Sequence, residues 1–148
     1  MKTLVLGLGN ELLADDGIGI AAARLLSKEV GAGVEVVESS LAGLPLMDVL
    51  SGYERAIIID AVCTGTAPPG TIIELAPDDI DFIPSPSPHY VGLPEMIRMA
   101  DQLGLEFPKE IRIIAIETAD LRTIGGEMSR QVKDALENVV NRVKKYLA

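Results

Sequence analysis

The chain is long enough for one sizeable hydrophobic core and too short for two ordinary domains. Its 148 residues are 48% hydrophobic and carry 22 acidic against 13 basic side chains, a formal net charge of −9, so nucleic acids and anionic membranes are poor partners. The single cysteine excludes an internal disulfide, the N-terminus lacks signal-peptide features, and no apolar stretch approaches the roughly 20 residues of a membrane span. We therefore expect one domain, residues 1–148, in the cytoplasm.

Apolar residues recur along the chain with two alternating periods. Residues 4–8 predict a strand buried on both faces, and from Ile18 to Leu26 the apolar spacing becomes helical. The later segments alternate in the same way, with strands expected at 34–38, 56–62, 71–75 and 110–116 and helices at 46–50, 93–103 and 130–147. Ser129 can cap the last helix. Polar residues alternate within 71–75, so we expect that strand near a sheet edge.

This order of elements predicts an α/β fold. We expect a single three-layer domain in which a twisted, mostly parallel five-stranded sheet carries helices on both faces, as in phosphorylase- and hydrolase-like proteins. In such sheets the ligand crevice forms at the carboxyl ends of the strands. Chemistry is therefore expected where strand 4–8 ends.

The first strand runs into a glycine-bearing turn and then into paired carboxylates. Gly7 and Gly9 resemble the start of a phosphate cradle, but Leu12 replaces the third glycine of that fingerprint, and Asp15 and Asp16 would repel a phosphate. One alternative is that both aspartates only complement the helix macrodipole, for at most about 1 kcal/mol each. A helix start needs only one acid, and adjacent acids repel each other, so the second is more easily explained as a ligand.

The segment 81–89 ends at the only histidine of the chain. Three prolines alternate with other residues in it, and each proline fixes its own φ and pushes the preceding residue toward an extended conformation. We therefore expect a stiff arm. A lone histidine is usually a surface or hydrogen-bonded residue, but a rigid arm just before a helix holds an imidazole in place, which makes His89 a candidate functional group.

Asp60 is the sole charge in the expected strand 56–62 and lies near its carboxyl end. An isolated charge is costly to bury, so Asp60 either accepts hydrogen bonds from the loop 61–70 or faces Asp16 across the crevice. In the second case Asp16, Asp60 and His89 form a mixed oxygen and nitrogen set suited to a divalent first-row ion, at about 2.0 to 2.2 Å if the ion were zinc. Three ligands leave one position open for water or substrate.

Four segments carry a longer pattern. They are the run from Gly7 through Asp15-Asp16 to Gly19, the strand end Asp60-Ala61, Ser87-x-His89 before a helix, and the helix entry 126–132. Together they span almost the whole chain and resemble the hydrogenase maturation endopeptidase family. The resemblance implies that Asp16, Asp60 and His89 are the metal-binding and catalytic triad, with glutamate in some members at the position of Asp16.

The resemblance also implies an activity. Such an endopeptidase, an aspartyl protease by its two aspartates, removes a short C-terminal extension from the large-subunit precursor of a nickel-iron hydrogenase after nickel insertion. The precursor is then the partner and carries the nickel, although other divalent ions can occupy the site. Either the metal licenses cleavage and acts as a Lewis acid, or a carboxylate acts as general base toward water. The residues leave both routes open.

No serine or cysteine is a convincing nucleophile. Cys63 lacks a second histidine to activate it, and a small buried thiol is the commoner state. Ser85 and Ser87 lie too close to His89 in a proline-stiffened arm, and no Gly-x-Ser-x-Gly nucleophile elbow is present. A serine or cysteine hydrolase is therefore not expected.

Two other functions compete with the protease. Gly7-Leu8-Gly9-Asn10 also resembles the start of peptidyl-tRNA hydrolase, but that enzyme needs a basic RNA-binding face, and here the net charge is −9 and the histidine is far from the glycine turn. A non-catalytic nickel-binding or precursor-docking module shares all three candidate ligands. Only a cleavage assay separates it from a protease.

Overall fold

Five strands form one sheet in the order β2-β1-β3-β5-β4. The computed structural model describes residues 2–84, 87–90 and 92–147. The strands are β1 (Thr3–Leu8), β2 (Val34–Ser39), β3 (Arg55–Val62), β4 (Ile72–Leu75) and β5 (Glu110–Glu117). All neighbours pair in parallel except β4, which pairs antiparallel with β5 at one edge. The expected α/β fold with a mostly parallel five-stranded sheet is confirmed, as is the edge position of the fourth strand.

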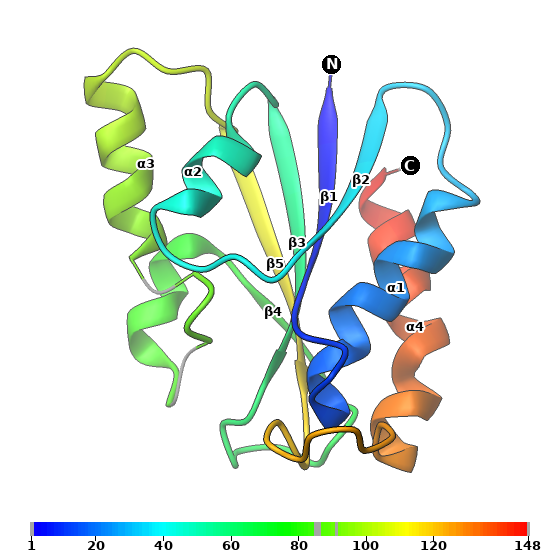
Figure 1. The fold of residues 1–148 in the computed structure, drawn as a ribbon. Helices are drawn as coiled ribbons and strands as arrows, with labels where there is room; N and C mark the ends of the chain where they lie inside the picture. The colour runs from blue at the N-terminus through cyan, green and yellow to red at the C-terminus, as the bar shows by residue number, and fades with distance from the viewer. Residues whose placement is uncertain (1, 85–86, 91, 148) are drawn as a thin grey trace.

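Helices cover both faces of this sheet. They are α1 (Ile18–Ser27), α2 (Pro45–Leu50), α3 (Leu93–Gln102) and α4 (Arg130–Leu147), with two short 3₁₀ helices, η1 (Ala14–Gly17) and η2 (Pro77–Phe82). Figure 1 shows α1 and α4 on one face and α2 and α3 on the other. Within the described residues, no helix is long and apolar enough to cross a membrane.

The sheet separates two apolar cores. Successive side chains of a strand point to opposite faces. Leu4 and Leu6 therefore pack with α2 and α3, whereas Val5 packs with α1 and α4. β1 is buried along its whole length because both faces are covered, which explains why its sequence is continuously apolar rather than alternating.

Glycines allow α1 and η1 to approach the ends of β1 and β3. A Cβ atom on Gly19 would lie 2.4 Å from the Leu8 carbonyl oxygen and 2.5 Å from that of Ile59. Gly9 has a φ of 149°, and a Cβ atom there would lie 2.0 Å from the Asp16 carbonyl oxygen. Close backbone packing thus accounts for these glycines, and it brings Asp16 over the carboxyl end of the sheet.

The helix start differs from the expectation. Asp15 and Asp16 lie in η1 rather than in the first turn of α1. The backbone N–H groups of Ala14 and Asp15 donate to the carbonyl oxygens of Thr123 and Asp120, at 2.9 and 2.8 Å. These contacts with a distant loop hold residues 14–17 as a separate turn, and local sequence carries no sign of them.

The expected arm 81–89 is only partly extended. Residues 81 and 82 end η2, so the prediction is wrong there. Pro77 opens this 3₁₀ helix, and the Asp79 carboxylate accepts the Ala76 N–H at 2.9 Å, which stabilises the first turn. Residues 85 and 86 of the expected arm, Ser85 among them, lie outside the described residues.

Candidate functional site

Three side chains meet at the carboxyl edge of the sheet. Asp16 comes from η1, Asp60 lies near the end of β3, and His89 precedes α3. One ligand atom from each, a carboxylate oxygen or a ring nitrogen, lies within 4.8 Å of the others. Donor atoms bonded to one ion at about 2.0 to 2.2 Å lie at most about 4.4 Å apart, so this grouping is close to what an ion requires.

Asp60 is held from two sides. Its side chain is fully buried. Oδ1 accepts the N–H of Ala61 at 2.8 Å, and Oδ2 accepts a hydrogen bond from the Ser87 hydroxyl. The carboxylate therefore has a defined orientation at the base of the cluster.

The other two side chains are also oriented by the backbone. Oδ2 of Asp16 accepts the N–H of Asn10 at 3.0 Å, and Oδ1 has no hydrogen bond to any described residue. Nδ1 of His89 lies 2.7 Å from the carbonyl oxygen of Leu41, a pair that forms a hydrogen bond only if Nδ1 carries the proton. Nε2 is then the nitrogen with a lone pair to offer a metal, as is usual for histidines oriented by a backbone carbonyl.

The two carboxyl groups of the cluster have unfavourable surroundings. Burial raises the pKa of Asp60 well above its ordinary range against the Ser87 hydrogen bond, and the nearby Asp16 adds to the rise. Burial also raises the pKa of Asp16, against the opposing effects of the Asn10 N–H and of His89. A cation between Asp16 and Asp60 would relieve the repulsion between the two carboxylates. The donor set and its charge therefore fit a divalent first-row ion.

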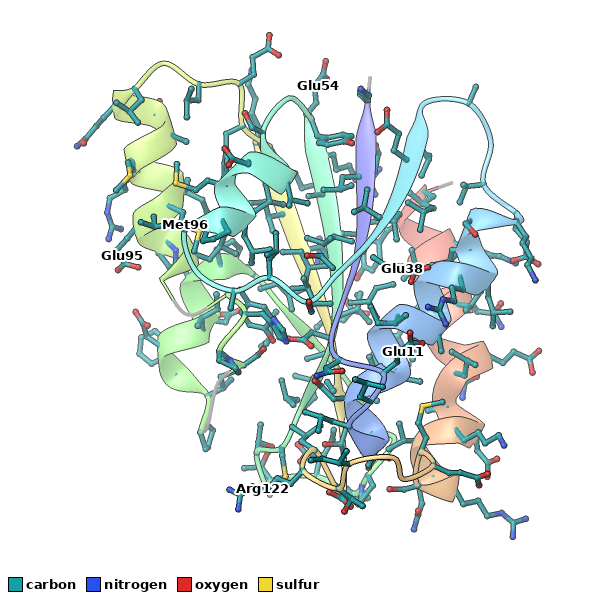
Figure 2. All side chains as sticks on the ribbon, in the orientation of Figure 1. Glu11, Glu38, Glu54, Glu95, Met96 and Arg122 are labelled. Carbon is teal, nitrogen blue, oxygen red and sulfur yellow. The ribbon has the colours of Figure 1, made fainter. Side chains whose placement is uncertain are left out.

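A cavity of about 610 Å³ opens beside the cluster. Asp16 and His89 line it, whereas the fully buried Asp60 does not. The rest of its lining comes from three segments: Ala61 to Cys63, Ser87 to Pro88, and Ala119 to Arg122 with Leu13. Figure 2 places Arg122 at the lower end of the molecule and Glu54, which lines a separate cavity of about 740 Å³, at the opposite end.

A family model described as hydrogenase maturation protease matches residues 20–146. The chain belongs to this family of peptidases. The resemblance inferred from the motifs is thereby confirmed, although the matched range begins after Asp16 and includes only Asp60 and His89 of the cluster.

Individual relatives of this maturation protease cover nearly its whole length. It is 30% identical over 152 residues to the hydrogenase expression/formation protein HupD of Thiocapsa roseopersicina, covering 99% of this chain and 68% of that protein. It is 29% identical over 147 residues to the hydrogenase 2 maturation protease of Escherichia coli, covering 95% and 89%.

Solved structures agree with the sequence relatives. The hydrogenase maturating endopeptidase HybD from E. coli superposes with a TM-score of 0.84 at 28% identity, covering 99% of this chain and 92% of that one. The [NiFe] hydrogenase maturation protease HybD from Thermococcus kodakarensis gives a TM-score of 0.73 at 29% identity, covering 99% of each chain.

Asp15 in this protease has a different task from Asp16. Its buried carboxylate accepts the N–H groups of Ala119 and Asp120, both at 2.9 Å, and the N–H and hydroxyl of Ser129. Burial raises the pKa of Asp15, but these hydrogen bonds outweigh it and hold the pKa below its ordinary value. Asp15 thus binds the loop before α4, so the interpretation that it only complements the helix dipole is wrong. Ser129, expected as a cap, donates its hydroxyl to Asp15.

The loop after β3 is held by a residue that the sequence did not single out. Glu117, buried at the end of β5, accepts the N–H groups of Thr64 at 2.9 Å and Gly65 at 3.1 Å. The Thr64 hydroxyl donates to the other oxygen of Glu117. Among the described residues Asp60 accepts from the loop 61–70 the N–H of Ala61 alone, so Glu117 rather than Asp60 holds this loop.

The burial of the Cys63 thiol also differs from the expectation. Cys63 is exposed rather than buried, because it follows the last buried residue of β3 and lines the cavity. The only histidine of the chain is directed toward Leu41 through Nδ1. A cysteine–histidine pair therefore does not form within the described part of the chain.

Proposed function

We propose that this protease removes the C-terminal extension of a nickel-iron hydrogenase large-subunit precursor once nickel has been inserted, and that it acts in the cytoplasm. The observation that carries the proposal is the grouping of Asp16, Asp60 and His89 within 4.8 Å in a member of this family. We further propose that these three residues bind the nickel that the precursor carries. A single-cysteine chain suits a reducing compartment.

Two of the proposed ligands have an atom without a hydrogen bond among the described residues, Nε2 of His89 and Oδ1 of Asp16, and both residues line the cavity from which a substrate approaches. Both oxygens of Asp60 already accept a hydrogen bond, so Asp60 would bind a metal through a remaining lone pair. Bound to these groups, the nickel of the precursor fixes the position of the segment beside it. Holding the reacting groups in place in this way lowers the entropic part of the activation barrier.

If a carboxylate of the cluster acts as general base instead of binding nickel, the arrangement favours Asp16 over Asp60 as the group that accepts a proton from the attacking water. Asp16 lines the cavity, while Asp60 lies beneath it without exposed surface. The raised pKa of Asp16, caused by burial, also suits a general base better than an ordinary aspartate does. Nickel, when present, supplies Lewis-acid chemistry at the scissile carbonyl.

The surroundings of the cavity suit a protein substrate. Four large apolar side chains are 44% to 81% exposed on segments that contact or adjoin the cavity residues Leu13 and His89, and we call them the apolar rim: Leu12, Leu41, Leu44 and Ile124. The Leu41 carbonyl bonds to His89, and the Gly125 N–H donates to the Leu12 carbonyl at 2.8 Å, which joins two parts of the rim. A substrate segment that enters the cavity brings the body of the substrate near this rim, and exposed apolar groups favour such contact.

The decisive experiment compares two forms of one substrate. The purified protein is incubated with nickel-loaded and nickel-free large-subunit precursor from the same genome, and the loss of the C-terminal extension is followed by mass spectrometry. We expect cleavage of the loaded precursor alone. His89→Ala should leave both forms intact, and Asp101→Asn, a carboxylate in the other cavity, should cleave like the parent protein.

The metal content of the enzyme provides a second criterion. One imidazole and two carboxylates form a weaker zinc site than histidine-rich or cysteine-rich sets, so the purified protein should be largely free of metal. Tightly bound stoichiometric zinc, together with efficient cleavage of nickel-free precursor, would overturn the proposal in favour of an ordinary zinc peptidase.

A further inference from the structure

Ser87 connects two of the three proposed ligands. It is buried, with 4% of its surface exposed. Its hydroxyl donates to Oδ2 of Asp60, and its oxygen accepts the backbone N–H of His89 at 3.3 Å. One small side chain thus contacts the carboxylate of one ligand and the backbone of another.

The same contacts argue against Ser87 as a nucleophile. A serine nucleophile needs a base that takes its proton and an open path to the substrate. Among the described residues Ser87 has no hydrogen bond to the imidazole of His89, whose Nδ1 is directed to Leu41. Its hydroxyl is directed at the fully buried Asp60.

We propose that Ser87 is a positioning residue that sets the orientation of Asp60 and His89 for metal binding. The inference rests on the proposed metal-binding function of the cluster. The last torsion of an aspartate side chain has broad minima, so an aspartate keeps one orientation only where hydrogen bonds hold it. Ser87 supplies the bond to Oδ2, and Ala61 supplies the one to Oδ1.

Loss of the Ser87 hydroxyl should affect both ligands together. Oδ2 of Asp60 would lose its donor at a position with no exposed surface, and the His89 N–H would lose its acceptor. Hydrogen-bond partners of metal ligands typically change metal affinity by about 10- to 100-fold when removed. A role in general stability alone would not change metal affinity in this way.

Thr118 provides a matched control at the same edge of the sheet. It is buried like Ser87, and its hydroxyl donates to the Val62 carbonyl oxygen at 2.9 Å. That contact involves none of the three proposed ligands. Thr118→Val removes a buried hydroxyl of equal type while preserving the shape of the side chain.

The test is calorimetric titration of the protein alone with Ni²⁺ and with Cd²⁺. Ser87→Ala should bind each ion about 10- to 100-fold more weakly than the parent protein. Ser87→Thr, which keeps the hydroxyl, should recover most of that loss, and Thr118→Val should bind like the parent. Circular dichroism and thermal unfolding of each variant establish that it is folded.

Each alternative outcome is decisive. If Ser87→Ala binds both ions within twofold of the parent, or if Ser87→Thr is as weak as Ser87→Ala, the hydroxyl does not position the ligands. An equal loss in Thr118→Val would show a general effect of lost stability and would also overturn the inference. If the parent protein itself binds neither ion, the proposed metal site fails, and that result is distinct from a failure of the Ser87 role.

Discussion

Two neighbouring aspartates, Asp15 and Asp16, have different partners and therefore different roles. Adjacent residues of a 3₁₀ turn such as η1 point about 120° apart, so only one of them can face a given site. Asp16 faces the cavity, whereas the Asp15 carboxylate is enclosed by the loop before α4. Asp16 is therefore the aspartate proposed to act in catalysis, and Asp15 is the one that holds the loop lining the same cavity.

Substitution by asparagine should separate these roles. Asp16→Asn should abolish precursor cleavage and keep or raise the melting temperature, because it removes a partly buried charge next to Asp60. Asp15→Asn should lower the free energy of unfolding by about 1 to 3 kcal/mol, since the amide presents N–H donors to groups that are themselves donors. Thermal unfolding and the cleavage assay measure both effects. Equal cleavage by the two variants would contradict the assignment.

At the scale of elements, the approach of α1 to the sheet depends on Gly19. The Leu8 and Ile59 carbonyl oxygens leave no room for a Cβ atom there. Gly19→Ala should lower the free energy of unfolding by about 1 to 3 kcal/mol, as overpacking of a core usually does. Gly31→Ala is the control, because its Cβ would meet nothing within 4 Å. Chemical denaturation compares the two, and similar stability would show that α1 can shift without cost.

A second contact between elements joins β4 to α4. Glu74 on β4 accepts hydrogen bonds from Tyr146 and Arg142 of α4. The Tyr146 hydrogen bond, more than the Arg142 contact and against the effect of burial, holds the pKa of Glu74 below its ordinary value.

This contact predicts a pH dependence of stability. A carboxylate with a depressed folded-state pKa stabilises the fold above its ordinary pKa, here 4.5, and that stabilisation is lost as the pH falls through the folded-state value. Glu74→Gln should therefore melt below the parent protein at pH values above 4.5, and the two melting temperatures should converge as the medium becomes more acidic. A difference that persists unchanged into acid would show that the charge of Glu74 is not its source.

At the scale of the whole molecule, the protein is strongly acidic, but large apolar side chains are exposed near the proposed site. The net charge is −9, yet four of the large exposed apolar side chains, the apolar rim, lie on segments next to the proposed site. A subunit awaiting its permanent partner exposes apolar surface, because obligate interfaces are more hydrophobic than transient ones. The rim therefore matches an unassembled large subunit better than a fully assembled enzyme.

The rim predicts a separation of binding from catalysis. Leu44→Gln combined with Ile124→Gln should raise KM for the loaded precursor about tenfold or more with little change in kcat, since contact away from the reacting atoms contributes uniformly to binding. Leu103→Gln combined with Leu105→Gln is the matched control, because these leucines are also exposed but lie at or after the end of α3. Steady-state kinetics distinguish the two, and an unchanged KM in the rim variant would rule out a docking role.

Local patterns in the sequence were sufficient for the five strands, for the four α-helices and for the choice of candidate residues, but not for the 3₁₀ helices η1 and η2. Periodicity predicted the strands and helices because burial imposes a period of two or 3.6 on apolar side chains. The isolated charge of Asp60 in an apolar strand and the lone His89 before a helix were visible for the same reason. The expected parallel order then placed both near the carboxyl edge of the sheet.

Only the tertiary structure decided which neighbour each of these groups has. Asp15 bonds to residues more than 100 positions away, Glu117 rather than Asp60 holds the loop after β3, and Ser87 reaches Asp60 across 27 positions. Local composition records what a side chain can bond to. The hydrogen-bond partner of a side chain depends on how separate elements pack. Contacts between distant segments produce no periodic pattern in the sequence, so the sequence alone does not predict them.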